Sequence, residues 1–442
     1  GSVKSNVGHL LTAAGSAGLI KVLLAMKNKK LPPMANFEKA AKGIDMENSP
    51  FTVLNEAKVW SLRNNNVPRR AAVSAFGFGG INAHVLLEEY SPARSPVVPS
   101  IRTKQISQSN DNDAIAIIGL DTHFGPWDTR EKFLARVLGN THSDHPVKAE
   151  NRWGLMQMSE FKGYTINQVD IQMGRFRIPP KELQDMLPQQ LLMLNVAANA
   201  LDDAGLNNIE NEHRTDAGVF IGIGLDLNTT NFHLRWSLLN KAKQWSEQLG
   251  LDLNDEELQA WINELRDQVG PPLSANRTMG ALGGIVASRI ARSFNIGGPG
   301  FTLSSEESSG MHALEIAVRA LQRNELNIAI TGAVDLSGDV RAAEGQHHLK
   351  PYSNIDTNLP FDNTSKGALI GEGAVALVLK RYADAKSDGD RIYSLITGLA
   401  STCGGHTNDI VPTIDTYKDS AMRACEDAGI TTDTISYIET HG

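Results

Sequence analysis

Apolar residues after position 113 fall into short continuous runs that alternate with segments of helical periodicity. The runs at 114–120 (AIAIIGL) and 217–222 are typical of strands buried on both faces. Residues 189–204 carry a stripe of apolar side chains and stop before Gly205, which predicts an amphipathic helix. The same criteria predict further strands at 301–303, 327–331, 374–379 and 393–397, a helix at 309–323, and a last strand that reaches Glu439. This alternation favours a layered α/β fold in which helices cover a mixed sheet.

The first 89 residues contain fewer strand signals than the rest of the chain. They predict a helix at about 12–28 and two strands, 71–75 and 82–87, on either side of a glycine-rich turn. The apolar stretch 10–26 is similar to an export signal, but Lys21 and two glycines interrupt it. We therefore expect a buried helix here, and we predict no membrane span in the chain.

A segment rich in proline and serine divides the chain. Residues 90–112 contain three prolines and five serines and show almost no apolar periodicity. Such a segment buries too little apolar surface to fold by itself, so it is typical of a tether. We therefore predict one folded unit at 1–89, a linker at 90–112 and a second unit at 113–442.

Residues 232–272 differ from their surroundings because three tryptophans lie at helical spacing among Lys, Glu and Gln. One interpretation is an inserted pair of helices with one buried face. The other is an interface for a partner subunit, since aromatic side chains are enriched at interfaces as well as in cores. The sequence leaves both interpretations open.

Composition narrows the class of protein. Apolar residues make up 41% and charged residues 21%, which is ordinary for a globular chain and excludes a disordered one. The net charge of −8 argues against a general nucleic-acid binder, although residues 1–89 carry +5 and the remainder −13. Two cysteines, Cys403 and Cys425, are too few for a disulfide framework and suit a reducing, cytoplasmic setting.

Two segments before the linker contain residues that could take part in catalysis or ligand binding. Lys4 and His9 lie just before the predicted helix, where a lone histidine is more often a cap or a core group than a catalyst. Residues 76–84 (FGFGGINAH) form a glycine-rich loop without the GxGxxG spacing of a dinucleotide site. Glycines there allow a sharp backbone turn beside a pocket, with Phe78 at its tip.

Residues 298–321 predict a strand, a tight turn and a helix. A residue on such a turn lies at a buried helix N-terminus, a position that activates a cysteine nucleophile in many enzymes. Here the turn contains Glu306, Glu307, Ser308 and Ser309 and no cysteine. On spacing alone, these acidic and hydroxyl residues indicate ordinary N-capping.

Other candidates are weaker. Asp362 and Glu372 could form a carboxylate pair, but both also suit turn and structural roles, which we favour. The chain contains no HExxH or CxxC motif, and the adjacent His347 and His348 would point apart on a helix or strand. We therefore predict no metal site.

Taken together, five segments resemble the β-ketoacyl synthase, or condensing-enzyme, family of fatty acid and polyketide synthases. They are VKSNVGHL (3–10), AFGFGGINAHVLLE (75–88), GPGFT (298–302) with the turn after it, PFDNTSKGALIGEGAVALVLK (360–380) and YIETHG (437–442). The resemblance covers nearly everything except the linker and 232–272. It implies the thiolase-like layered fold, α-β-α-β-α.

The order of the motifs differs from the family's order. In the family the nucleophile turn comes first, then the GEG segment, the EAHGTGT-like motif, SNxGH and finally GFGG, whereas here SNVGH and GFGG come first. We interpret the chain as the C-terminal part of one ketosynthase domain joined to the N-terminal part of a second, within a fragment of a larger synthase. A circularly permuted single domain is the alternative.

The resemblance also implies roles for individual residues. His9 corresponds to the histidine that assists malonyl decarboxylation, Lys4 to the lysine that orients that site, and Phe78, Gly79 and Gly80 to the substrate-gating loop. His441 corresponds to the other catalytic histidine, active or vestigial. Glu307 occupies the position of the nucleophilic cysteine. Because a carboxylate cannot hold an acyl chain as a thioester, the second domain resembles an inactive chain length factor.

The closely spaced pair of domains resembles the tandem of bacterial polyunsaturated fatty acid synthases. The implied reaction of the intact synthase is decarboxylative Claisen condensation of acyl and malonyl thioesters. It needs no bound cofactor, because the substrates ride on the phosphopantetheine of acyl carrier protein. The implied partners are that carrier protein and a ketosynthase/chain-length-factor pairing or homodimer. The alternatives are a fragment of a modular polyketide synthase, or a non-catalytic or decarboxylase-type module.

Overall fold

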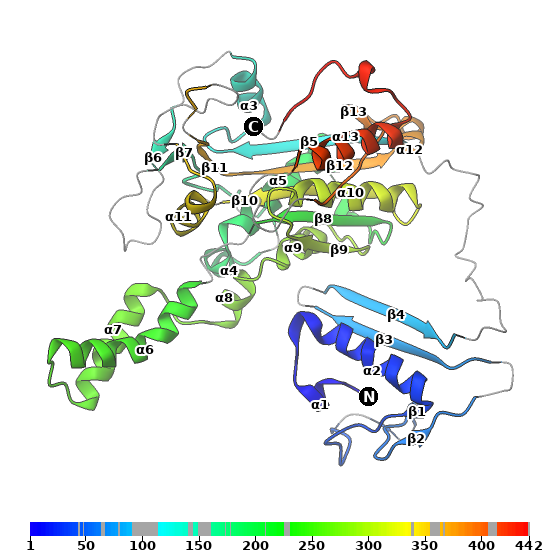
Figure 1. Ribbon diagram of the computed structural model, residues 1–442, viewed down its shortest axis with the longest axis vertical. Helices are drawn as coiled ribbons and strands as arrows, with labels where there is room; N and C mark the ends of the chain where they lie inside the picture. The colour runs from blue at the N-terminus through cyan, green and yellow to red at the C-terminus, as the bar shows by residue number, and fades with distance from the viewer. Residues whose placement is uncertain are drawn as a thin grey trace. The chain divides into compact units, whose positions relative to one another are not determined.

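The computed structural model divides the chain into two compact units, Gly1–Ser107 and Gln108–Gly442 (Figure 1). Apart from Tyr90, the predicted linker lies outside the described residues. The described residues are 1–42, 45–46, 48–62, 67–77, 80–90, 114–139, 145–148, 161–172, 174–176, 178–207, 209–224, 230–336, 340–353, 363–365, 367–404 and 413–440.

A six-stranded mixed sheet forms the centre of the second unit, in the order β13-β5-β12-β10-β8-β9. β9, β8 and β10 run parallel to one another, and β12, β5 and β13 add antiparallel partners. The bounds are β5 Ile115–Phe124, β8 Ala217–Ile223, β9 Gly300–Leu303, β10 Ile328–Asp335, β12 Gly373–Arg381 and β13 Ser394–Ile396. Each of these strands was predicted from the sequence, and the mixed α/β class is confirmed.

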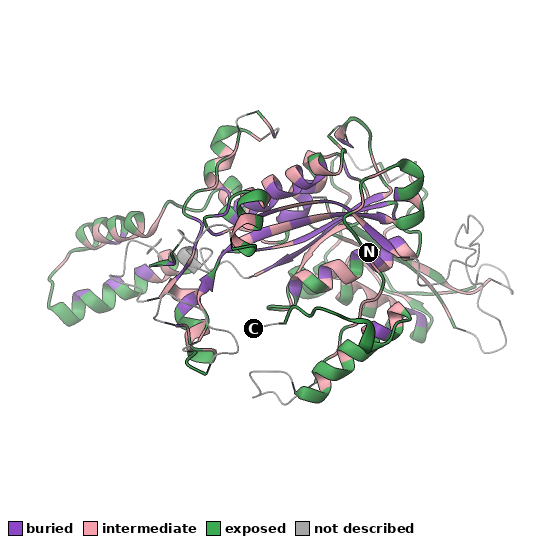
Figure 2. Cartoon of the chain, turned by 90° about the horizontal axis from the view of Figure 1, so that it is seen from above, coloured by how far each residue is buried: buried purple, intermediate pink, exposed green. Residues whose placement is uncertain are grey.

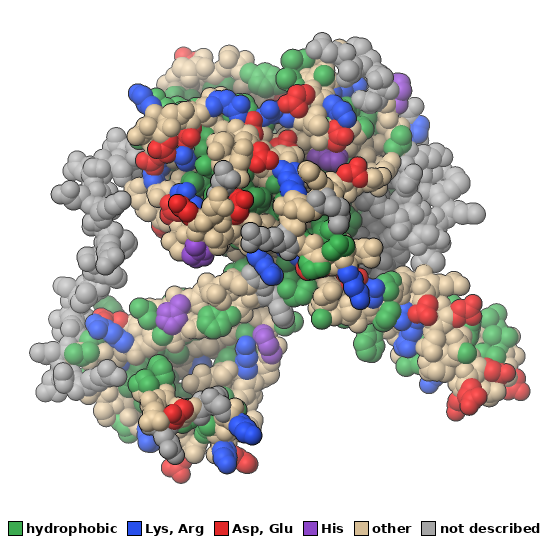
Figure 3. All heavy atoms as spheres, turned by 180° about the vertical axis from the view of Figure 1, so that it is seen from behind, with side chains coloured by type: hydrophobic (Ala, Val, Ile, Leu, Met, Phe, Trp, Pro, Cys, Tyr) green, Lys and Arg blue, Asp and Glu red, His purple; other side chains and the backbone are tan. Residues whose placement is uncertain are grey.

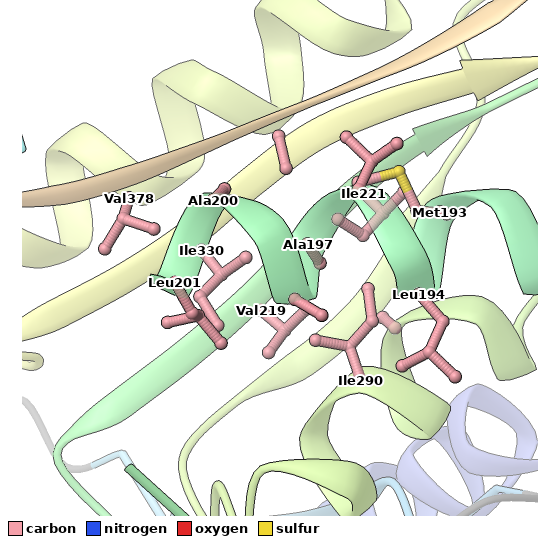
Figure 4. Packing of buried hydrophobic residues seen from close by; sticks show 14 of the residues in the cluster. Met193, Leu194, Ala197, Ala200, Leu201, Val219, Ile221, Ile290, Ile330 and Val378 are labelled. Carbon is pink, nitrogen blue, oxygen red and sulfur yellow. The ribbon is translucent and has the colours of Figure 1, made fainter. Parts of the chain in front are cut away.

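Helices cover both faces of this sheet. On one face α5 and α9 pack against alternate residues of the strands, such as Val219 and Ile330 (Figure 4). On the other face α10 packs against Phe220 and Ala329. The strands are therefore buried on both sides, as Figure 2 shows, which explains their continuous apolar sequences. The bounds are α5 Pro188–Asp203, α9 Ile285–Ser293 and α10 Ser309–Gln322.

The remaining elements of the second unit border this core. They are α3 Arg130–Val137, α4 Pro180–Asp185, η2 Ile209–Asn211, α8 Ala275–Gly280, α11 Val340–Leu349, α12 Tyr382–Asp388, α13 Ile414–Ala428, η4 Thr432–Thr434, and the small sheet β11-β7-β6 made of β6 Val147–Lys148, β7 Lys162–Tyr164 and β11 Ile370–Gly371. β7 carries Tyr164 to the edge of the large sheet because its main chain bonds to Glu372, directly before β12.

The predicted helical pair is present as α6 (Thr230–Leu249) and α7 (Asp255–Val269). The pair buries Leu238, Ala242 and Ile262 between its helices, while the side chain of Trp236 remains 75% exposed. Acidic side chains gather at the far end of the hairpin (Figure 3), where α7 begins with a capping box of Asn254 and Glu257. The pair of helices with one buried face is confirmed, and an interface at this hairpin stays a prediction.

The first unit contains one longer helix and two small sheets. The helix α2 lies against β3, where Gly15 and Gly18 allow a close approach to Ala75 and Val73. The elements are α1 Lys4–Val7, η1 Leu11–Ala13, α2 Ala14–Asn28, β1 Lys30–Leu31 paired with β2 Lys58–Val59, and β3 Arg70–Phe76 paired with β4 Asn82–Glu88. The predicted helix and hairpin are confirmed.

Two expectations are wrong. Only Ala25 and Met26 of α2 are buried, because among the described strands only β3 and β1 lie against this helix and much of its surface stays exposed. Residues 436–440 form no strand, although one was predicted to reach Glu439. A strand needs a neighbouring strand to receive its hydrogen bonds, and no described strand pairs with this segment.

One carboxylate fixes the end of α5 against the sheet. Asp203 accepts hydrogen bonds from the Leu120 main-chain N–H (3.0 Å) and from Arg130 (2.7 Å), and it pairs with Arg391 (2.6 Å). Burial acts to raise the pKa of Asp203, but the hydrogen bonds from Arg130, Leu120, Arg391 and Tyr393 outweigh it and hold the pKa below its ordinary value. The ionised form is therefore part of the folded structure.

We expect Asp203→Asn to lower the free energy of unfolding by roughly 1.5–3 kcal/mol at neutral pH, because two charge-assisted bonds are lost. A lowered pKa stabilises the fold above the unfolded aspartate pKa and loses that contribution as the pH falls. The difference between variant and parent should therefore shrink below about pH 4. Urea unfolding at several pH values measures it. Asp202→Asn, which removes one exposed pair with Arg175, is the control and should cost less than about 1 kcal/mol.

Candidate functional site

The strand–turn–helix segment predicted from the sequence lies at the carboxyl ends of the three parallel strands. In open α/β sheets this edge is where ligands bind. A Cβ atom at Gly222, in β8, would lie 2.6 Å from the main-chain carbon of Ser309, and one at Gly310 would lie 3.1 Å from Cβ of Ala333. Both glycines therefore permit the start of α10 to press directly onto β8 and β10.

Hydroxyl groups fix the turn before α10. Ser309 Oγ accepts from the Ser305 N–H (2.8 Å) and donates to the Glu306 carbonyl (2.6 Å), while Ser308 Oγ donates to the Ser305 carbonyl (2.7 Å). Glu306 has a left-handed φ of +51°, which is uncommon for a residue with a side chain. The N-cap residue Ser308 makes no capping bond to the helix. The expectation of ordinary N-capping is therefore wrong, since the hydroxyls bond the turn instead.

Glu307 lies at the tip of this turn. Its Oε1 accepts a hydrogen bond from Lys350 Nζ at 3.0 Å, and the two side chains are 57% and 40% exposed. Burial raises the pKa of Tyr352, and the negative charges of Asp335 and Glu307 raise it further. Glu307, Asp335, Lys350 and Tyr352 therefore form one cluster of charged and polar groups beside the turn.

A cavity of about 460 Å³ opens next to this cluster. Its size is within the range of small-molecule sites. It is lined by Phe124, Gly125, Trp127, Tyr164, Gly222, Ile223, Gly224, Glu306, Glu307, Ser309, Gly310, Ala333, Val334, Asp335, Gln346, Gly371, Glu372, Gly373, Ala374 and Val375. The lining residues come mainly from the ends of β5, β8 and β10, the start of β12, β7, β11, α11 and the turn.

Aromatic side chains form one wall of the cavity. The rings of Trp127 and Tyr164 lie 4.9 Å apart, and the guanidinium of Arg136 lies 5.3 Å from the Trp127 ring. Arg136 also donates to the Tyr164 hydroxyl at 3.2 Å. Phe124 is fixed by an edge-to-face contact with Phe133 at 4.8 Å. This wall is apolar and held on its outer side by Arg136.

Glu372 has a structural role next to the aromatic wall of the cavity. The residue is buried, its Oε2 accepts from the Ile166 N–H at 2.6 Å, and its main chain bonds to Tyr164 and Gly125. It thereby joins β5, β7 and β12. Asp362 lies outside the described residues, so the suggested carboxylate pair is not shown.

The first unit contains the other predicted site residues except His441, which belongs to the second unit. His9 Nδ1 accepts from the Leu11 N–H at 3.0 Å, and both His9 and Lys4 are exposed. Gly80 has a φ of +88°, in the turn that joins β3 to β4. Phe78, Gly79 and His441 lie outside the described residues. Lys4, His9 and Gly80 therefore belong to one unit and Glu307 to the other.

Several residues at the cavity were missed by the sequence reasoning. Asp335 is the last residue of β10 and lies four residues after the end of the predicted strand 327–331, so the rule that ligands bind at carboxyl ends of strands could have indicated it. Lys350 and Tyr352 follow a helix without any recognisable spacing. Trp127 and Tyr164 lie outside the strong motifs, and only the fold brings them together.

No group of three metal-binding side chains occurs among the described residues. His347 Nδ1 accepts a hydrogen bond from the Tyr352 N–H at 2.9 Å, so this ring helps to fix the loop after α11.

Two further sequence features are the cysteines and the apolar stretch near the N-terminus. Cys403 and Cys425 are both free thiols. None of the described helices is long and apolar enough to cross a membrane.

We expect Gly222→Ala to destabilise the second unit by about 1–3 kcal/mol, because the added methyl group would overlap the main chain of Ser309. Gly345→Ala, on exposed α11, is the matched control, since nothing lies within 4 Å of the added methyl group. Alanine should stabilise that helix by roughly 0.5–1 kcal/mol. Denaturant unfolding measures both. Equal stability of the two variants would contradict the close packing of α10 on β8.

Comparison with known proteins gives the family of the chain. The sequence profile of the β-ketoacyl synthase N-terminal domain matches residues 112–385, and that of the C-terminal domain matches residues 1–38. The C-terminal match therefore precedes the N-terminal match along the chain, as the motif order predicted.

Among curated relatives, a polyunsaturated fatty acid synthase polypeptide of Thraustochytrium sp. is 29% identical over 90% of this chain. Polyketide synthase PksN of Bacillus subtilis is 48% identical over 106 residues, or 23% of this chain. The chain spans only 19% and 2% of the lengths of these two relatives.

A solved structure, the PfaC keto synthase–chain length factor, superposes with a TM-score of 0.79 at 29% identity and covers 97% of this chain and 44% of its own. The ketosynthase of module 6 of the bacillaene synthase from Bacillus subtilis 168 has a TM-score of 0.55 at 24% identity and covers 75% of this chain and 51% of its own, which supports the fold alone. The thiolase-like α/β class is confirmed. The chain belongs to the β-ketoacyl synthase family.

Proposed function

We propose that the chain joins the end of a condensing ketosynthase domain (1–89) through a linker (90–112) to the beginning of a non-condensing, chain-length-factor-like domain (113–442). The intact synthase would carry out decarboxylative Claisen condensation on acyl carrier protein. The observation that supports the second role is Glu307, which occupies the tip of the turn before α10 and pairs with Lys350 at 3.0 Å.

The chemistry of Glu307 separates this domain from a condensing one. Condensation requires a nucleophile that takes the acyl group as a thioester and releases it to a carbon nucleophile. A glutamate can form only a mixed anhydride, which water hydrolyses readily. Its carboxylate is more than half exposed and already hydrogen-bonded, so it is neither desolvated nor activated as a nucleophile. The helix N-terminus nevertheless tolerates its charge.

The first domain would supply the condensing chemistry. In this proposal His9 assists loss of carbon dioxide from the malonyl thioester and stabilises the enolate, and Lys4 orients that site. Phe78, Gly79 and Gly80 form the loop that gates substrate entry. The exposed positions of His9 and Lys4 leave them accessible to further parts of a synthase.

The relatives favour a polyunsaturated fatty acid synthase. One is a polypeptide of such a synthase, and the solved structure is named a keto synthase–chain length factor. The substrates would ride on the phosphopantetheine of acyl carrier protein, and the second domain would pair with a ketosynthase. The high identity to a polyketide synthase over 106 residues favours a polyketide synthase as the second candidate.

Acylation at the turn tests the assignment of Glu307. We expect no covalent acyl adduct when the Cys403→Ser chain is incubated with hexanoyl carrier protein and examined by intact mass spectrometry. The Glu307→Cys/Cys403→Ser chain should gain a hexanoyl thioester, because the new thiol lies at a helix N-terminus. Glu306→Cys/Cys403→Ser, one residue earlier, is the matched control and should gain much less. An adduct on Glu307 itself would contradict the proposal.

We expect the unsubstituted chain to form no β-ketoacyl product from hexanoyl and malonyl carrier proteins, because the described turn offers no thiol. Liquid chromatography with mass spectrometry detects the product, and a longer synthase containing a complete ketosynthase domain is the positive control. Product from the chain alone would refute the non-condensing assignment. Release of carbon dioxide from malonyl carrier protein alone, increased in Glu307→Gln, would favour the decarboxylase alternative.

A further inference from the structure

The α6–α7 hairpin leaves much of its apolar surface uncovered. Its two helices pack on each other, and neither packs extensively on another described element. Figure 1 shows the hairpin extending away from the large sheet. The side chains of Trp236 and Leu249 are 75% and 67% exposed, and three further large apolar side chains are exposed with them: Leu239, Trp245 and Leu251. Because tryptophan is enriched at the centres of protein interfaces, this surface is typical of one that a second protein covers.

The core shared by the two helices is small. Among the described side chains of the hairpin, only Leu238, Ala242, Ser246 and Ile262 are buried. Helices in proteins are stabilised mainly by packing an apolar face on a neighbour, and so few buried side chains supply little of that energy. A second hairpin packed on the first would complete a four-helix bundle and bury the exposed apolar side chains.

Charge is distributed unevenly along the hairpin. We define the tip as residues 244–260 and the stem as residues 230–243 together with 261–269. The tip contains no Lys or Arg and five acidic residues, so it carries −5, whereas the stem contains four basic and two acidic residues and carries +2. Lys241 and Lys243 are exposed residues of the stem. The acids of the tip are Glu247, Asp252, Asp255, Glu256 and Glu257.

This distribution distinguishes between the two ways of pairing two hairpins. With the tips side by side, five acidic residues would face five others and repel them. In the antiparallel orientation each tip lies against the stem of the other copy, and opposite charges meet. A two-fold axis perpendicular to the hairpin produces this orientation and makes both contacts identical. The hairpin is therefore complementary to an inverted copy of itself.

The hairpin is large enough for a specific interface. Since α6 has 20 residues, the hairpin is about 30 Å long, and two helices side by side are about 20 Å wide. One face therefore measures about 600 Å², and two copies would bury about 1,200 Å² in total. This area is at the lower end of the range for specific protein interfaces, so we expect reversible association.

We propose that the α6–α7 hairpin is a docking surface for a second copy of this chain, and that two hairpins pack antiparallel, tip against stem, as a four-helix bundle. The exposed Trp236 and Leu239 of each stem then lie against the exposed Leu249 and Leu251 of the other copy's tip. The proposal goes beyond the proposed function and does not depend on the role of Glu307.

Self-association of the full chain tests the proposal. Sedimentation velocity between about 1 and 200 µM should show a dimer with a Kd in the micromolar range, as expected for an interface of this size. Lys241→Glu/Lys243→Glu should raise the Kd at least about tenfold, because the stem then repels the tip. Lys39→Glu/Lys42→Glu makes the same change in net charge at exposed residues of the first unit. This control should leave the Kd within about twofold of the parent value.

A charge exchange between two variants tests the antiparallel orientation. Glu247→Lys/Asp252→Lys/Glu256→Lys gives the tip a charge of +1, so this variant should also associate at least about tenfold more weakly than the parent. An equimolar mixture with Lys241→Glu/Lys243→Glu should form a heterodimer, because each tip then meets a stem of opposite charge. The heterodimer should be at least about tenfold tighter than either homodimer.

The apolar contact is tested separately. Trp236→Ser should raise the Kd at least about tenfold. Circular dichroism checks that each variant folds. If a charge variant does not fold, Trp236→Ser still decides the outcome, because the exposed Trp236 side chain is not part of the core.

Three results would overturn the proposal. One is a chain that stays monomeric at the highest concentration, including a monomer whose hairpin binds a different protein. The second is a dimer that neither the charge variants nor Trp236→Ser weaken, which would place the contact on another surface. The third is a mixture of the two charge variants that associates no more tightly than either variant alone.

Discussion

The close approach of α10 to the sheet is the constraint on which the site depends. Main chain meets main chain at Gly222 and Gly310, so the helix begins directly on the ends of β8 and β10. The turn before α10 therefore lies at this edge of the sheet, and hydrogen bonds of the Ser309 hydroxyl group fix its conformation. Whatever residue occupies position 307 is therefore presented at the mouth of the cavity. In the proposed function this is the position of the family's nucleophile, and this chain has a carboxylate there.

The presence of a carboxylate changes the electrostatics of the whole edge. With Asp335 at the end of β10, it gives the cavity a negative rim against an aromatic wall. Lys350 Nζ lies 3.0 Å from the Glu307 carboxylate. This ion pair offsets the repulsion between Glu307 and the neighbouring carboxylates. In the proposed function, the absence of condensation by this domain follows from the carboxylate at position 307.

The rest of the second unit keeps this edge rigid. Glu372 joins three strands by main-chain hydrogen bonds on one side of the cavity, and Asp203 fixes α5 against β5 on the far side of the sheet. Both residues can affect the cavity without contacting a ligand, because each fixes an element that positions lining residues. The α6–α7 hairpin stands apart, since its buried residues contact mainly each other.

The sequence by itself determined the strands of the large sheet, because a strand buried on both faces must be apolar throughout. It also predicted α2, α5, α10 and the α6–α7 pair, but not α9 or α13. It also predicted the strand, turn and helix that contain Glu307, while the role of Glu307 stays a prediction. It was wrong about the strand up to Glu439 and the burial of α2, because both depend on neighbours that local pattern does not contain. Only the tertiary structure brought Lys350 and Trp127 to the same site as Glu307. These residues are far apart in sequence, and packing rather than spacing decides which of them meet.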